Sequence, residues 1–159
     1  MDVGVQQDKI EEVKETIAPL AEQIKDSSRG LERHREIGAI IEEQPQDIRA
    51  MFRDKMYENE ASDIDLGGPG CDNKVWYRIH GEKSPDQAAP EFTLTETDFL
   101  LHNLIMPSQR EHLLENRNLD FSYSMSGTDS VTGAKRFRAD MYFDLEYLAL
   151  NMRKIDNEI

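Results

Sequence analysis

The stretch RFRADMYF, residues 136–143, alternates charged or polar side chains with apolar ones, and this alternation indicates the fold. Successive side chains of a β-strand point to opposite faces, so Phe137, Ala139 and Met141 would face a core. Arg136 and Arg138 would then lie on the other face. We therefore predict a half-buried strand whose arginines are turned away from the core and are free to meet an anion.

Further stretches alternate in the same way. VWYRIHG, residues 75–81, places Arg78 on the face opposite its apolar residues, and LDFSYS, residues 119–124, predicts another strand. A short strand is expected at Ile64 and Leu66, and a last one over residues 145–155. Strands this short and polar on one side are typical of an antiparallel sheet with one covered face.

Apolar residues spaced three and four apart predict helices in the first third of the chain. The first stripe consists of Ile10, Val13, Ile17, Leu20 and Ile24, and Pro19 should kink or interrupt this helix. Two further stripes follow near residues 31–44 and 46–59. Later, Thr95 followed by Asp98 resembles a capping box, and Pro107 suits the first turn of a further helix.

The order of these elements is helices, two strands, two helices and three strands. It predicts an α+β fold, in which an antiparallel sheet is covered on one face by helices. Residues 1–44 are expected to form a helical extension, and residues 46–159 one main domain. A chain of 159 residues suits one compact core.

Charge and cysteine content narrow the classes of partner and compartment. The formal net charge is -13, so the average field of the surface should repel a nucleic-acid backbone. A lone Cys71 offers no internal disulfide, and the start of the chain lacks the pattern of a signal peptide, which together favour a reducing cytosol. No apolar run approaches the roughly 20 residues that cross a bilayer, so contact with a membrane would be indirect.

Four short strings, in order, resemble the N-terminal domain of type IV pilus and type II secretion ATPases, most of all the PilT-type pilus-retraction family. They are an Ala-Ser-Asp segment at residues 61–63, an Arg-Ile-His-Gly turn at 78–81, Asp-Phe-Ser at 120–122 and Arg-Phe-Arg at 136–138. The resemblance covers residues 46–159. His80 stands where the family has Asp, and Asp65 stands where it often has His.

The resemblance implies a fold and a role. Family members are hexameric ATPases of twitching motility and secretion, in which a PAS-like N-terminal domain packs on RecA-like motor domains of its own and neighbouring subunits. ATP and magnesium bind in the motor domain, and arginines of the N-terminal sheet approach the terminal phosphate. Transferred to this chain, the phosphate-sensing residues are Arg138 first, then Arg136 and Arg78. The location implied is cytoplasmic, peripheral to an inner-membrane machine.

The sequence carries no Gly-x-x-x-x-Gly-Lys-Ser/Thr motif, so this chain alone is not expected to hydrolyse ATP or to bind it tightly. We expect no catalytic residue, no metal site and no cofactor in it. We expect this chain to be the N-terminal piece of a longer protein, from which the RecA-like motor domain is missing.

Several alternatives stay open. The arginines could be solvated, or paired across strands with Asp140 or Asp144. The chain could be a free-standing PAS-like module that binds a ligand or a protein without any ATPase, or an acidic adaptor that binds through residues 1–44. Its four histidines are scattered, and we expect them to be surface or packing residues.

Overall fold

The structure is a computed structural model that describes residues 2–24, 28–45, 61–87, 90–125 and 135–155. The helix predicted over residues 46–59 lies outside these ranges. The elements are, in chain order, α1 (Asp2–Ala21), α2 (Gly30–Glu43), β1 (Asp63–Gly67), the 3₁₀ turn η1 (Pro69–Cys71), β2 (Trp76–Ile79), β3 (Glu82–Pro85), α4 (Leu94–His102), α5 (Pro107–Asn116), β4 (Asn118–Met125), β5 (Lys135–Asp144) and β6 (Tyr147–Ile155).

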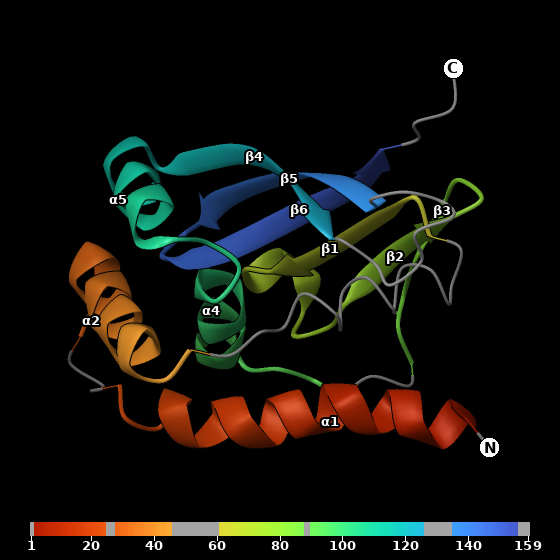
Figure 1. Cartoon of the computed structure of the whole chain (residues 1–159), viewed down its shortest axis with the longest axis horizontal. Coiled ribbons are helices and arrows are strands. Elements are labelled where there is room, and N and C mark those ends of the chain that lie inside the picture. Colours follow the sequence, from red (N-terminus) through yellow and green to blue (C-terminus); the bar gives the residue numbers. More distant parts are fainter. Residues whose placement is uncertain (1, 25–27, 46–60, 88–89, 126–134, 156–159) are drawn as a thin grey trace.

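The strands form one six-stranded sheet in the order β3-β2-β1-β6-β5-β4, and every neighbouring pair is antiparallel. Helix α4 packs on the central strands β1 and β6, and α1 and α2 pack on α4. Figure 1 shows α1, α2 and α4 together on one side of the sheet. The predicted α+β class, with an antiparallel sheet covered on one face by helices, is therefore confirmed.

The alternation of the strands decides which face is covered. Phe137, Ala139 and Met141 of β5 are buried, as are Leu150 and Met152 opposite them on β6. Their intervening neighbours point to the other side of the sheet, because the side-chain period of a strand is two. We call this second side the outer face; it carries the three predicted arginines, all exposed.

The two N-terminal helices share the core with the sheet. Ile17 and Leu20 of α1, and Ile37 and Ile41 of α2, are buried in the same apolar cluster as the strands and α4. Helices α1 and α2 are thus packed against the predicted main domain over a common core. The boundary near residue 45 stays a prediction.

Two local predictions differ from the structure. The predicted interruption at Pro19 was wrong: helix α1 continues through this residue and ends at Ala21, so the proline lies in the last turn and Ile24 of the predicted stripe lies beyond the helix. The capping box of α4 uses Thr93 and Glu96, whose side chains each accept a hydrogen bond from the other's backbone N–H, at 3.1 and 2.7 Å. The predicted pair, Thr95 and Asp98, lies two residues further along the chain, and both side chains accept hydrogen bonds from Arg33 of α2.

The strand β3 was not predicted, so three strands precede α4 where we expected two. Its residues pair with β2 from Trp76 opposite Pro85 to Ile79 opposite Glu82. β3 forms one edge of the sheet, which explains how a segment with no buried side chain can belong to it.

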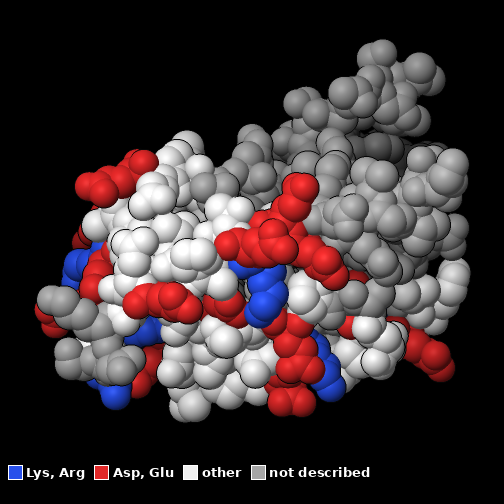
Figure 2. Space-filling view, turned by 90° about the horizontal axis from the view of Figure 1, so that it is seen from below, with Lys and Arg blue, Asp and Glu red and all other residues white. Residues whose placement is uncertain are grey.

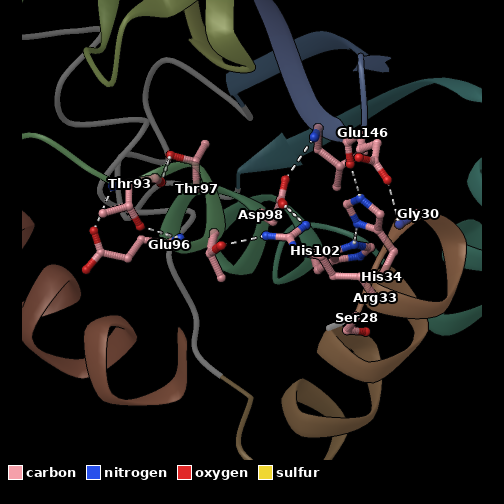
Figure 3. A network of polar contacts seen from close by, with 12 residues as sticks. Ser28, Gly30, Arg33, His34, Thr93, Glu96, Thr97, Asp98, His102 and Glu146 are labelled. Carbon is pink, nitrogen blue, oxygen red and sulfur yellow. Dashed lines mark hydrogen bonds and ion pairs between the residues drawn. The ribbon is translucent and has the colours of Figure 1, made fainter. Parts of the chain in front are cut away.

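A buried ion pair fastens α2 to α4 (Figure 3). Arg33 donates to Asp98 Oδ2 and, over 2.6 Å, to the hydroxyl of Thr95, and both charged residues are buried. The second oxygen of Asp98 accepts the backbone N–H of Leu148 at 2.8 Å. Burial raises the pKa of Asp98 to about 6, although Arg33 and the Leu148 N–H both favour its ionised form. One carboxylate therefore joins α2, α4 and the start of β6.

A chain of hydrogen bonds runs beside this pair. Arg110 Nε donates to His102 Nδ1 over 3.1 Å, which requires the proton of His102 to sit on Nε2. That proton is donated to His34 Nδ1 over 3.0 Å, and His34 Nε2 donates to the Glu146 carbonyl over 2.8 Å (Figure 3). Every donor thus meets an acceptor only while both rings are neutral.

Burial also opposes protonation of these rings. It lowers the pKa of His34 to about 4 and holds the pKa of His102 well below its ordinary value, and nearby arginines lower both further. The expectation that these histidines are packing residues holds for both, since neither is exposed. Together, the ion pair and the histidine chain tie α2 to α4, α5 and the turn between β5 and β6.

Candidate functional site

The strand register brings side chains from five strands into one line across the outer face, and four of the five are basic. Arg138 lies opposite Arg153, Arg153 opposite Asp63, Asp63 opposite Arg78, and Arg78 opposite Lys83. We call these five residues the cation row. Four positive charges flank a single carboxylate there, in a chain whose overall charge is strongly negative. These positive charges would attract a small anion to this part of the sheet.

Arg138 and Arg136 lie on β5 and are exposed on the side away from the helices. Within the described residues, the side chain of neither arginine makes a hydrogen bond or an ion pair. The two acids considered as partners are engaged elsewhere: Asp144 accepts the Gly70 N–H at 3.2 Å, and Asp140 lies opposite Asp120. No residue of the described ranges therefore neutralises these guanidinium groups, and their role in phosphate sensing stays a prediction.

Arg78 is exposed as well, but it is turned toward its own hairpin. Its Nη1 donates to the Gly81 carbonyl over 3.0 Å, at the turn between β2 and β3. Lys83 lies 3.7 Å from Asp65 and 5.8 Å from the centre of the Trp76 ring. The β2–β3 end of the cation row is thus partly occupied by contacts within the protein.

Arg153 was missed by the sequence analysis and lies in the middle of the row. Its Nε donates to Asp63 Oδ2 over 3.2 Å, and its side chain stays 68% exposed, whereas that of Asp63 is 6% exposed. Nothing in the local sequence distinguishes Arg153, because its neighbours on the two adjacent strands come from β1 and β5. Only the register shows that it stands beside Arg138.

A row of acids runs next to the cation row on the outer face. It consists of Asp120, Asp140 and Asp65, with Asn151 between the last two. Burial, and then the neighbouring Asp120, raise the pKa of Asp140, and Asn151 donates to Asp65 over 3.0 Å. On the outer face, the sign of the charge therefore changes from one line of side chains to the next.

The helical side carries a different charge pattern. Figure 2 views the molecule from the α1 side and shows acidic side chains spread over the described surface, with basic ones in smaller spots between them. Exposed acids of α1 include Glu11, Glu12 and Glu15. This surface would repel a phosphate, which makes the outer face the better candidate.

Metal and nucleophile chemistry finds no support in the described ranges. No group of three histidine, cysteine or acidic side chains in them is arranged to hold a metal ion. Cys71 is half-buried, and burial, with the charge of Asp65, raises its pKa, so the thiolate is disfavoured. In the same ranges, no helix is both long and apolar enough to span a membrane.

The comparison with solved structures agrees with the resemblance. No family model matches the sequence, and no curated protein sequence matches it either. Among solved structures, the chain is similar to the pilus retraction motor PilT with bound ADP, at 26% identity and a TM-score of 0.55, over 68% of this chain and 29% of that one.

Two further structures share the fold. The ATPase DotB of Legionella pneumophila is 19% identical with a TM-score of 0.51, and that of Yersinia pseudotuberculosis is 16% identical with a TM-score of 0.50. The match covers 70% of this chain and 31% of each DotB chain, so the chain spans under a third of the length of these proteins. The predicted likeness to pilus and secretion ATPases is therefore confirmed, as a likeness to one part of them.

Proposed function

We propose that this chain is the N-terminal regulatory and oligomer-forming domain of a hexameric pilus or secretion ATPase. The observation that carries the proposal is the set of exposed arginines on the outer face of a sheet whose fold resembles part of PilT. In this proposal the sheet is the PAS-like unit. RecA-like motor domains of the same and neighbouring subunits are its partners, and the location is the cytoplasmic side of an inner-membrane machine.

The arginines would sense the terminal phosphate of ATP held by the motor domain with magnesium. A guanidinium is always charged, and its planar fork can grip a phosphate through two parallel hydrogen bonds. Arg138 is the strongest candidate because, within the described part of the chain, no acid neutralises it, and Arg136 follows two residues along the same strand. Arg78 ranks lower since it already donates to Gly81.

Such a contact would couple the nucleotide to the position of the domain. With ATP present, the bond to Arg138 favours closure of the outer face over the motor domain. After hydrolysis and release of phosphate the arginine loses its target, and the closed state loses its advantage. The rotation of this domain would then follow the state of the nucleotide.

The alternative of a free-standing ligand-binding module has less support. A pocket between β1 and the start of α4, lined by residues such as Leu66, Phe92 and Thr97, encloses only about 10 Å³. This is room for about one water molecule, not for an organic ligand.

The test compares ATP hydrolysis by the full-length protein that contains this chain with that of its Arg138→Gln variant. One lost charge-assisted grip is worth about 1.5–3 kcal/mol, so kcat should fall about 10- to 100-fold. Arg35→Gln, on the exposed side of α2, is the matched control and should change kcat less than about twofold. An unchanged kcat in Arg138→Gln, or a gene that encodes no motor domain, would contradict the proposal.

A further inference from the structure

Leu145 stands at the tip of the hairpin that joins β5 to β6, in a backbone conformation that suits other residues better. Asp144 pairs with Tyr147, so Leu145 is the first of two turn residues, and its φ is 59°. Two-residue hairpin turns with a positive φ at this position favour glycine. The side chain of Leu145 is also 77% exposed, the largest fraction for any large apolar residue in the described ranges.

The combination of the two features needs an explanation that neither feature needs alone. Single exposed leucines are normal on protein surfaces. Here the positive φ lowers the stability of the folded chain, the side chain gains little burial in return, and glycine or asparagine would avoid the strain. A residue that breaks a local rule without a gain inside its own chain is typical of a site kept for binding.

We propose that the tip of this hairpin docks on another protein surface, where Leu145 inserts into an apolar pocket bordered by lysine or arginine side chains. The surface we assign is that of the RecA-like motor domain, so the inference rests on the proposed function. It adds to that function an anchoring residue and the chemistry of the surface that receives it. We call Asp144, Leu145 and Glu146 the hairpin tip.

The hairpin tip is held in place by three hydrogen bonds. Asp144 Oδ2 accepts the Gly70 N–H at 3.2 Å, and Glu146 Oε1 accepts the Gly30 N–H at 2.9 Å. The carbonyl of Glu146 accepts a bond from His34 Nε2 over 2.8 Å, and Figure 3 shows Glu146 beside Gly30 and His34. The two residues that flank the leucine are therefore fixed before a partner arrives, which reduces the entropy lost on binding.

A second exposed apolar side chain lies on the same hairpin. Within the described ranges, the exposed large apolar residues are Leu145, Tyr142 and Met106, and Tyr142 is 38% exposed. Tyr142 points to the outer face, since it lies four residues after Arg138 on β5 and the side-chain period is two. In the proposed function this face closes over the motor domain. The hairpin tip ends the strand that carries both side chains, which is why we assign the motor domain as its partner.

The charge of the hairpin tip selects a basic surface. The carboxylates of Asp144 and Glu146 flank Leu145 in the chain, and the bonds described above come to them from uncharged backbone N–H groups. No lysine or arginine of the described ranges forms an ion pair with either carboxylate. Opposite charges across an interface attract, whereas like charges repel a wrong partner. A second copy of this chain would bring the same two acids and a net charge of -13, so it fits the hairpin tip poorly.

The first experiment locates the partner surface in the full-length protein that contains this chain. It replaces Leu145 by the photoreactive residue p-benzoylphenylalanine and irradiates the purified protein with a non-hydrolysable ATP analogue. We expect cross-links from position 145 to motor-domain peptides that contain lysine or arginine, identified by mass spectrometry. The matched control replaces Met106, which is 62% exposed between α4 and α5, and should give no motor-domain cross-link above background.

The second experiment measures whether the contact supports closure. If the hairpin tip binds the motor domain in the closed state, Leu145→Asn should raise the apparent Kd of the full-length protein for ATP about 10-fold, with less than about a twofold change in kcat at saturating ATP. Leu145→Met keeps an apolar anchor and should stay within about threefold of the wild type. Met106→Asn should change neither quantity.

Stability separates docking from a structural role of the leucine. Leu145→Asn should stabilise the 159-residue chain, because asparagine tolerates the positive φ, and should weaken ATP binding by the full-length protein. A purely structural leucine would change both quantities in the same direction.

The charge of the hairpin tip is tested by Glu146→Gln, which keeps the oxygen that accepts the Gly30 N–H. Loss of a negative charge would by itself favour an anionic nucleotide, whereas loss of docking should raise the apparent Kd for ATP about two- to threefold at low salt and less at high salt. Glu115→Gln, at an exposed position of α5, makes the same change of net charge elsewhere and should not weaken ATP binding.

Two outcomes overturn the docking site: no motor-domain cross-link from position 145, or an apparent Kd for ATP in Leu145→Asn within about twofold of the wild type. Cross-links between two hairpin tips would identify a second copy as the occupant and would overturn it as well. None of these results touches the proposed function, which is decided by kcat in Arg138→Gln. If the gene encodes no motor domain, the docking site and the proposed function fail together.

Discussion

Acid should loosen the attachment of α2, because the hydrogen-bond chain through His34 and His102 needs both rings neutral. Protonating His34 would place a proton on Nδ1, which faces the Nε2–H of His102, so two donors would meet. The perturbation is a shift from pH 7 to pH 5, compared between the wild-type chain and His34→Gln. Glutamine keeps a donor and an acceptor at this position and does not titrate.

The magnitude follows from the pKa of His34, which burial lowers from 6.5 to about 4. A folded-state pKa below the unfolded value means that the stabilisation is complete above pH 6.5 and is lost as the pH falls toward 4. The difference of about 2.5 pKa units corresponds to roughly 3 kcal/mol in total, of which about 2 kcal/mol is lost between pH 7 and 5. This window stays above the pI of 4.7, where the chain is least soluble.

Asp98 titrates in the opposite sense and must be separated from His34. Its pKa is raised to about 6, so the folded state binds a proton more tightly and gains stability as the pH falls from 6 toward 3.8. Both the wild type and His34→Gln contain Asp98, and its contribution therefore cancels in the difference between them. The difference isolates the titration of His34.

The assay is urea unfolding followed by the fluorescence of Trp76, at half-unit steps from pH 7.5 to 5. We expect the wild-type free energy of unfolding to fall about 2 kcal/mol more than that of His34→Gln. His112→Gln, on the exposed side of α5, controls for the loss of an imidazole as such. A difference between wild type and His34→Gln that stays constant within about 0.5 kcal/mol over this range would refute the reasoning.

Two substitutions test single backbone positions. Leu145 has a positive φ of 59° and is 77% exposed in the two-residue turn between β5 and β6. Leu145→Gly should therefore raise the free energy of unfolding by up to about 1 kcal/mol in thermal or urea unfolding, and Leu145→Asn should act in the same direction. A loss of stability in both variants would contradict the assignment of backbone strain at Leu145. A Cβ at Gly38 would lie 2.7 Å from Arg110 Cδ, so Gly38→Ala should cost about 1–2 kcal/mol in urea unfolding despite the better helix propensity of alanine. The control variant Ala39→Gly, at the exposed neighbouring position, measures the difference in helix propensity between alanine and glycine in α2. A Gly38→Ala variant more stable than the wild type would show that the contact with Arg110 matters little.

The strands and their open face were predictable because alternation with period two is a local property of the sequence. Phe137 and Arg138 are assigned to opposite faces by their positions alone, and the structure agrees. The edge strand β3 was not predictable in this way. Its residues Glu82 and Lys83 are exposed, and it is held by backbone hydrogen bonds to β2, which leave no pattern in side-chain polarity.

The capping box shows how a tertiary contact overrides a local signature. The segment TLTETD, residues 93–98, contains two overlapping capping patterns, Thr93 with Glu96 and Thr95 with Asp98. The second pair is taken by Arg33, which approaches from α2 and binds both side chains. Since Arg33 lies about sixty residues away in the sequence, no local rule could have chosen between them.

The candidate site was half predictable for the same reason. The arginines of β5 stand out within a short alternating string. Arg153 follows the apolar run of β6, and only the register of β6 with β5 and β1 places it beside Arg138 and Asp63. Asp63 was identified by its motif, but its contact with Arg153 spans 90 positions of the chain. Long-range pairing, and not the residue types, made these roles invisible in the sequence.

The hairpin of β5 and β6 links the buried network to the outer face. Asp98 holds the Leu148 N–H and His34 holds the Glu146 carbonyl, so both anchors from the helical side bind the start of the strand that carries Arg153. The proposed phosphate contact of Arg138 requires β5 to keep a fixed position, which a hairpin anchored only at its edges would not guarantee. The helix α2 contributes no residue to the outer face. By holding the turn of this hairpin from the helical side, it nevertheless helps to fix the strands that carry Arg138 and Arg153.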